Sequence, residues 1–246
     1  VDDGIITTYA GNLDENNNVT TTWEAWIYPT INDGNWRMIM GMEDGGWDRF
    51  VAVNSGYINI STGNGAWSPV TADLNTWQHI AVVYNNSSGT IKFYKNGNLY
   101  TKTGLASTNS SHNFGIGCSQ QSSLNVPTQT FKGKIDEVRY WLGERSQTQI
   151  QSAMNTELVG AEPNLVAYYN FNQGIPNGNN TAISVMPDVT GRGNNGTLLN
   201  FAKTGTTSNI VGGPSSLSVG QSSGLSSSLC FSSSAQTASL TYPLST

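Results

Sequence analysis

The sequence is poor in charged residues, which account for 11% of its 246 positions, whereas soluble domains usually contain roughly 25%. Acidic residues number 16 and basic residues 11, which gives a formal net charge of −5. Proteins that bind nucleic acid normally present a basic surface to the phosphates. This charge balance argues against a nucleic-acid partner.

The sequence also lacks long apolar runs. It contains no stretch of 18 consecutive apolar residues, so we expect no transmembrane segment. Neither an initial Met nor a charged and then apolar leader stands at its start. We therefore interpret it as a mature or trimmed form from which any signal has been removed.

Cysteine and histidine are scarce. Cys118 and Cys230 are the only cysteines, which is too few for a zinc site or a disulfide framework. Two alternatives stay open for them: a long-range disulfide in an oxidising compartment and a pair of buried free thiols. The only histidines, His79 and His112, stand in no Ser or Cys motif typical of nucleophilic catalysis.

In place of charge the sequence has turn residues and large aromatic side chains. The 7 Trp, 10 Tyr and 7 Phe residues supply enough apolar area for a core, and Gly, Asn and Ser separate short segments rich in apolar and β-branched residues. These segments span residues 20–28, 37–42, 49–53, 57–61, 77–84 and 90–95. Many short strands at regular spacing predict an all-β sandwich or barrel.

Two local patterns refine this prediction. The Asn-Gly pair at 96–97 favours a tight hairpin, because both residues accept a positive φ. Ser146 and Gln149 have the spacing of a capping box, and Ile150 begins a set of apolar residues at helical spacing. We expect one short helix near residues 146–155.

The composition changes after about residue 212. Residues 213–246 contain 13 Ser, which is typical of a linker, so we divide the sequence into a β-sandwich domain over 1–212 and a tail over 213–246. Within the tail, regularly placed apolar residues nevertheless predict a strand-forming segment over about 225–242. They are Leu229, Phe231, Leu240 and Tyr242.

Several segments, taken in order, resemble LamG-like domains, which are concanavalin A-like jelly rolls found in laminin G modules, pentraxins and secreted proteins of Bacteroidetes-type bacteria. The similar segments are residues 22–29, 75–84, 93–97, 131–141, 164–171 and 188–198. The resemblance covers roughly residues 1–211. It implies an all-β, two-sheet antiparallel jelly-roll sandwich, a secreted or cell-surface location, and a binding or adhesive role that often depends on calcium.

The same fold includes glycoside hydrolases, whose catalytic carboxylates lie close together on one strand in an E-x-D-x-x-E pattern, because glycosidic cleavage needs an acid and a nucleophile or base. The sequence contains no such pattern. Glu43 and Asp44 precede two glycines and indicate a turn, while Glu24 stands alone between two Trp residues and indicates a structural role. We expect a protein that is not an enzyme.

Calcium is the cofactor that the resemblance suggests. Asp136 matches a position where related proteins hold a structural calcium ion, and its alternative role is an ion pair with Arg139 or Arg145. Asp188 and Asn194 form a second candidate site in a Gly-rich loop, since calcium prefers carboxylate and amide oxygens. The alternative for Asp188 is a turn cap through its own backbone.

Sugar binding requires aromatic faces near polar groups in a concave or loop surface. Three Trp residues lie in turn-rich segments with polar neighbours, whereas Trp26, Trp77 and Trp141 lie in strands and are expected in the core. The candidate ligand-binding residues are Trp36, Trp47, Trp67, Asp33, Asp48 and Asn64. The same Trp residues could instead pack against loops or contact a surface protein. Our first hypothesis is a non-catalytic extracellular module for carbohydrate or cell-surface binding.

The second hypothesis is a structural subunit that assembles with identical subunits into an extracellular filament. The family's first strand resembles residues 228–234 followed by residues 1–7, so the sandwich domain lacks the first part and the tail carries it. The tail strand could pair with its own domain, insert into the next subunit as a donor strand, or begin a following domain. With insertion, a disulfide between Cys118 and Cys230 could lock the strand.

Overall fold

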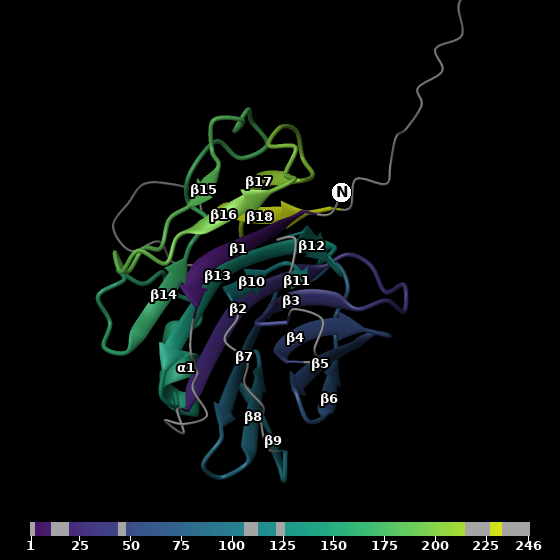
Figure 1. Ribbon diagram of the computed structural model, residues 1–246, viewed down its shortest axis with the longest axis vertical. Helices are drawn as coiled ribbons and strands as arrows, with labels where there is room; N and C mark the ends of the chain where they lie inside the picture. Colours follow the sequence, from purple (N-terminus) through teal and green to yellow (C-terminus); the bar gives the residue numbers. More distant parts are fainter. Residues whose placement is uncertain are drawn as a thin grey trace, which may run out of the picture.

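The computed structural model describes residues 3–10, 20–43, 48–105, 113–121, 126–214 and 227–232. It confirms the expected jelly-roll class, because two antiparallel sheets pack face to face around one apolar core (Figure 1). None of the helices in these ranges is both long and apolar enough to cross a bilayer.

The first sheet contains eight strands, in the order β15 (Val185–Met186), β16 (Gly196–Leu199), β1 (Gly4–Ala10), β10 (Asn113–Ile116), β3 (Arg37–Gly41), β4 (Arg49–Asn54), β5 (Tyr57–Thr62) and β6 (Ala66–Thr71). The second contains β17 (Asn209–Gly212), β18 (Ser227–Phe231), β13 (Gly133–Leu142), β2 (Thr21–Pro29), β7 (Gln78–Asn85), β8 (Thr90–Lys95) and β9 (Asn98–Thr103), with β14 (Leu165–Tyr169) also paired to β13. A small pair, β11 (Ser119–Gln121) and β12 (Val126–Thr128), lies beside them.

The core forms because the central strands alternate apolar and polar side chains with a period of two. On β2, Trp23, Ala25 and Ile27 face the space between the sheets and are fully buried. The Trp23 ring lies 4.9 Å from Tyr84 and 5.2 Å from Phe114, measured between ring centroids. The residues of β2 between these three therefore face the outer side of the second sheet.

The second sheet branches at β13, which pairs with three strands. It pairs with β2 along one side, while its other side pairs with β18 at residues 133–135 and with β14 at residues 138–141. A register shift between Asp136 and Arg139 lies between the segment that pairs with β18 and the segment that pairs with β14. The backbone of Glu137 there has a φ of 53°. Because of this bulge, Ile135 and Val138 both face the core although they are three residues apart.

The two local predictions are confirmed. Asn96 and Gly97 have φ values of 50° and 76° in the turn between β8 and β9. Helix α1 (Gln147–Ala153) begins after Ser146, and both hydrogen bonds of the predicted capping box are present. The helix lies on the outer face of the second sheet, where Ile150 packs against side chains of β7 and β8.

The tail contributes β18, which lies within the segment predicted to form a strand. It pairs with β13 and β17 of its own chain, and Leu229 and Phe231 enter the core between the sheets. Leu240 and Tyr242, also assigned to this strand by sequence, lie outside the described residues.

The disulfide, one of the two alternatives for the cysteines, does not form. Cys118 and Cys230 are both buried free thiols. Cys118 contacts the carbonyl oxygen of Ile5 in the first sheet at 3.7 Å. Cys230 lies between two residues that point into the core, so strand alternation places its thiol on the opposite, outer face of the second sheet. This correction favours the alternative of two free thiols.

Candidate functional site

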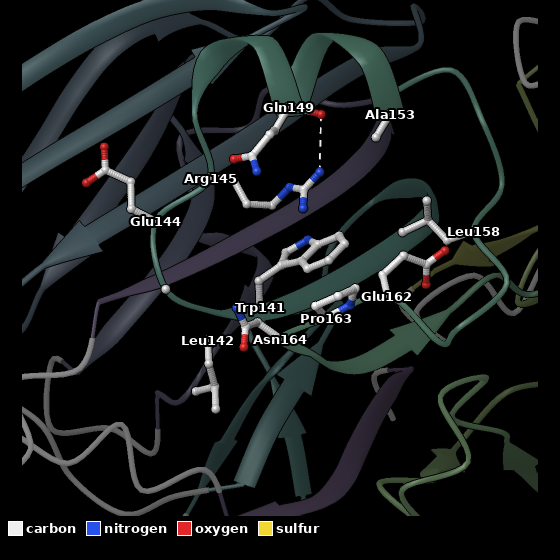
Figure 2. A pocket seen from close by; sticks show the side chains of 11 residues that line it. Trp141, Leu142, Glu144, Arg145, Gln149, Ala153, Leu158, Glu162, Pro163 and Asn164 are labelled. Carbon is white, nitrogen blue, oxygen red and sulfur yellow. Dashed lines mark hydrogen bonds between the residues drawn. The ribbon is translucent and has the colours of Figure 1, made fainter.

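A pocket of about 400 Å³ opens on the outer face of the second sheet. It lies between the end of β13, the start of α1 and the loop of residues 158–164 (Figure 2). Its volume falls within the roughly 300–1,000 Å³ typical of small-molecule sites. Apolar and polar groups both line it, as in many ligand-binding sites, so we take it as the candidate site.

Trp141 is the aromatic centre of the pocket. Its side chain is 2% exposed, and the guanidinium carbon of Arg145 lies 3.8 Å from the ring centroid, a cation–π arrangement. Figure 2 shows Arg145 lying across the indole and Pro163 beside it. The indole Nε1 is buried and has no hydrogen-bond partner among the described residues, an expensive state for a buried donor.

Arg145 is fixed by contacts on three sides. Its backbone N–H donates to the hydroxyl of Thr22 at 3.0 Å, and its Nη2 donates to the carbonyl of Gln149 at 3.2 Å. Its Nε lies 3.3 Å from Oε1 of Glu24. Because the guanidinium is anchored to both the helix and the sheet, the upper wall of the pocket is preorganised.

A buried charged cluster supports the pocket from below. Glu24 of β2 faces Arg139 directly across the strand pair, and its Oε2 lies 3.4 Å from Nε2 of His79 on β7. All three residues are at most 1% exposed. The outer face of this sheet is therefore a second buried layer, and around Glu24 it is ionic where the sandwich interior is apolar.

Arg139 connects this cluster to the end of the helix. Its guanidinium donates to the carbonyls of Ala153 and Thr156 at 3.0 and 2.6 Å, and to Glu137 at 2.5 Å. Tyr168 in turn donates its hydroxyl to Glu137 at 2.7 Å. Positive charge at a helix C-terminus stabilises the unpaired carbonyls there, so Arg139 fixes how α1 sits on the sheet.

The protonation states follow from burial and pairing. Burial alone would raise the pKa of Glu24, but contact with His79 and the charges of Arg139 and Arg145 hold that pKa below its ordinary value. Burial lowers the pKa of His79, although Glu24 opposes the shift. At neutral pH, Glu24 is therefore ionised and His79 is neutral.

Two carboxylates lie at the rim. Glu144 forms an ion pair with Lys92. Glu162 accepts the backbone N–H of Val159 through Oε1 at 3.0 Å, while its Oε2 is buried without a partner among the described residues. Two residues that line the pocket, Trp141 and Glu162, therefore each carry a buried polar atom without a partner among the described residues.

The ligand-binding residues predicted from the sequence are not gathered in one place. Asp33 and Trp36 lie in the loop before β3, beside the turn between β4 and β5, where Asn54 donates to the carbonyl of Gly34. Asp48 and Asn64 lie at the other end of β4 and β5. Six residues of strand span about 20 Å, so the two pairs cannot contact one small sugar together.

The remaining Trp residues of that prediction are separated further. Trp67 packs against the core from β6 and is directly opposite Ile60. Trp36 instead packs edge-on against Phe50, 5.5 Å between centroids, in a separate cluster. Trp47 lies outside the described residues. A role for these residues in ligand binding stays a prediction.

The first candidate calcium position is Asp136. It is fully buried, and its Oδ1 accepts the backbone N–H of Glu137 at 2.8 Å. No group of three or more His, Cys, Asp or Glu side chains is arranged to hold a metal anywhere in the described ranges.

The second candidate position is Asp188, which the structure does bring next to Asn194. Its carboxylate accepts the backbone N–H groups of Tyr168, Thr190 and Asn194 and the hydroxyl of Thr190. These bonds match the alternative in which Asp188 caps its own loop. Calcium binding at either position remains a prediction.

Sequence reasoning missed the pocket because Trp141 was expected in the core. Strand alternation offers a signal, because Tyr140 and Trp141 are adjacent and only one of them can face the interior. Tyr140 does so, with its ring centroid 5.7 Å from that of Trp23. Trp141 is buried instead under Arg145 and the loop of residues 158–164.

Comparison with known proteins supports the same architecture. Residues 2–151 match a family model of the concanavalin A-like lectin/glucanase superfamily. No curated protein sequence matches the chain. A Bacteroides ovatus protein provisionally assigned to carbohydrate binding is 23% identical, with a TM-score of 0.62 over 80% of this chain and 55% of that one.

Two further solved structures are similar over shorter stretches. The heptameric pentraxin of Limulus polyphemus is 14% identical, with a TM-score of 0.45 over 61% of this chain and 74% of that one. Domain 4 of the extracellular arabinanase AbnA from Geobacillus stearothermophilus is 19% identical, with a TM-score of 0.41 over 54% of this chain and 65% of that one. At 23% identity, the Bacteroides ovatus structure establishes the fold alone.

Proposed function

Because the chain belongs to the concanavalin A-like lectin/glucanase superfamily, we propose that it is a non-catalytic carbohydrate-binding module that works outside the cell. Its ligand occupies the pocket above Trp141. The observation that carries the proposal is the buried indole N–H of Trp141, which has no partner in the described structure although it lines a pocket of ligand size. The carbohydrate binding assigned to the similar Bacteroides ovatus protein supports it.

The polar groups of the pocket suit a hydroxylated ligand. A sugar hydroxyl both donates and accepts hydrogen bonds, so hydroxyls can accept from Trp141 and donate to Oε2 of Glu162. Arg145 is already paired with Glu24, and Glu162 has no ion-pair partner within the described residues. A negatively charged sugar would meet the carboxylate of Glu162, so the proposed ligand is a neutral glycan.

The positions of the carboxylates favour binding over hydrolysis. Glycoside cleavage needs two carboxyl groups that flank one glycosidic bond. Glu144 and Glu162 lie on opposite sides of the pocket, and their carboxylates point away from each other (Figure 2). Glu24 is buried beneath the pocket and paired with Arg145.

A glycan array followed by titration tests this proposal. Trp141→Phe keeps the aromatic ring and removes the N–H, and we expect a loss of affinity between twofold and tenfold, the equivalent of about 0.5–1.5 kcal/mol for one hydrogen bond. Glu162→Gln tests the acceptor. Trp36→Phe makes the same change at the site predicted from the sequence, and binding that is unchanged there but weakened in Trp141→Phe would place the ligand at Trp141.

Two results would contradict the proposal. One is that the intact protein binds no glycan, and the other is that Trp141→Phe and Trp36→Phe weaken binding equally. Thermal unfolding of each variant separates a loss of binding from a loss of folded protein.

A further inference from the structure

β18 fills a slot between β17 and β13 in the second sheet. It pairs with β17 on one side, from Ser227 opposite Gly212 to Cys230 opposite Asn209, and with β13 on the other. All five of its residues are buried. A strand from the tail therefore completes the sandwich, next to the start of β1 (Figure 1).

The slot is shaped for this strand. Phe231 lies over Gly117, where an added Cβ would come within 2.1 Å of the Phe231 ring. The same ring packs edge-on against Phe201 with centroids 5.2 Å apart. Leu229 is fully buried in the same core. Close packing of this kind selects one sequence in one register.

A polar clamp fixes the far end of the strand. The backbone N–H of Ser232 donates to Oδ2 of Asp3 at 2.8 Å, and the backbone N–H of Asp3 donates to the carbonyl of Ser232 at 3.4 Å. The Asp3 side chain is 1% exposed. If the slot were empty, the buried carboxylate of Asp3 would lose the N–H of Ser232, and the apolar surfaces that contact Leu229 and Phe231 would be exposed. The slot therefore needs an occupant.

The connection to β18 is longer than its geometry requires. Gly212 and Ser227 are directly opposite each other in adjacent antiparallel strands, a geometry that about two connecting residues can close. The chain provides 14 residues there, numbers 213–226, and nine of them are Gly or Ser. Fully extended, 14 residues reach about 46 Å, enough to place β18 in a neighbouring molecule.

We propose that β18 exchanges between copies of this chain, so that residues 227–232 of one copy fill the slot of a second copy in the same register. The exchanged strand makes the same contacts as the strand of the slot's own chain. The balance between the two states therefore depends on concentration. A short connection gives an effective concentration in the millimolar range, so pairing within one chain prevails in dilute solution. Exchange prevails where copies are crowded or held side by side.

Two variants of the connection test the proposal. In the first, residues 213–226 are deleted and Gly212 is joined to Ser227, so the chain cannot reverse and β18 cannot reach its own slot. In the second, the same residues are replaced by Asn-Gly, which closes a hairpin within one chain. Light scattering after size-exclusion chromatography gives the mass, and near-ultraviolet circular dichroism reports native aromatic packing.

We expect the deletion variant to be a native dimer or larger assembly and the Asn-Gly variant to be a native monomer. A native monomer from the deletion variant would overturn the proposal, and so would an unfolded deletion variant beside a native Asn-Gly variant. The full chain gives a second measurement: refolding near 1 mM, about the effective concentration of the tether, should yield exchanged dimers that refolding a hundredfold more dilute does not. Monomers alone at the higher concentration would also overturn it.

Discussion

The two faces of the second sheet bury side chains by opposite means. β2 contributes to both, with Trp23 in the sandwich interior and Glu24 on the outer face, and each is 0% exposed. Trp23 is surrounded by aromatic rings. Glu24 lies among His79, Arg139 and Arg145.

The two faces contribute differently, one to the stability of the fold and the other to the positions of the elements packed on it. Apolar burial is non-directional, and a core tolerates volume-conserving changes. A buried ion pair adds little net stability, but removing one partner is costly because the other charge is left unpaired. We infer that the interior holds the sandwich together, while the ionic layer fixes where α1 and the pocket wall lie.

The largest expected effect is in the interior. Trp23→Ala should lower the free energy of unfolding by about 3–5 kcal/mol, because it removes a large buried ring and leaves a cavity. Denaturant unfolding measures the change. Trp23→Phe is the conservative control and should lose less. Equal losses in both variants would show that ring volume is not what this position requires.

The next effect tests the ionic face. Arg139→Met keeps the length of the side chain but leaves Glu137 and Glu24 without their shared cation, and the expected loss is about 3 kcal/mol. Arg37→Met is the matched control, because Arg37 pairs with Asp33 near the surface, where ion pairs contribute at most about 1 kcal/mol.

The double variant Arg139→Met with Glu137→Met sharpens the same comparison. It removes a charge of each sign and should recover part of the stability, yet glycan binding should stay weak because α1 has lost its C-terminal anchor. Full recovery of binding would contradict a positioning role for Arg139.

The interior was predictable because its signals are local. Alternation on β2, the Asn-Gly turn at 96–97 and the capping box at Ser146 each follow from a few neighbouring residues, and each is present. The ionic layer was not predictable in the same way. Glu24 was correctly expected to be structural, but its partners come from three other segments of the chain.

The pocket depended on a feature that the sequence does not reveal. The bulge at Asp136 and Glu137 shifts the alternation of β13, and this shift decides that Tyr140 faces the core and Trp141 faces outward. Strand pairs tolerate a bulge at many positions, so its location could not be derived from residue types. The tail strand was easier to predict from the sequence, because Leu229 and Phe231 alternate with the residues between them.

The smallest expected effect is a dependence of the free energy of unfolding on pH, which arises from the outer face and not from the interior. Burial lowers the pKa of His79, and the net effect of its neighbours lowers that of Glu24. As pH falls below about 6.5 and then below about 4.3, the unfolded chain takes up protons that the folded chain does not. Stability should therefore fall with decreasing pH.

The size of that pH effect has an upper bound. One proton contributes at most about 1.4 kcal/mol per pH unit, and chemical denaturation at pH 7.5 and 5.5 measures the His79 part. His79→Gln should flatten the slope over this range, whereas Trp23→Phe should leave the slope unchanged. An unaltered slope in His79→Gln would place the proton uptake elsewhere.

The contact between Asp3 and Ser232 joins residues 229 positions apart, which has a consequence for the order of folding during synthesis. Residues 133–135 of β13 leave the ribosome long before β18, so one side of that strand remains unpaired during synthesis. Unpaired strand edges in unfinished chains are prone to aggregation, and pairing between distant segments is slow. Until residue 232 has emerged, this edge of the nascent sandwich remains open to such contacts.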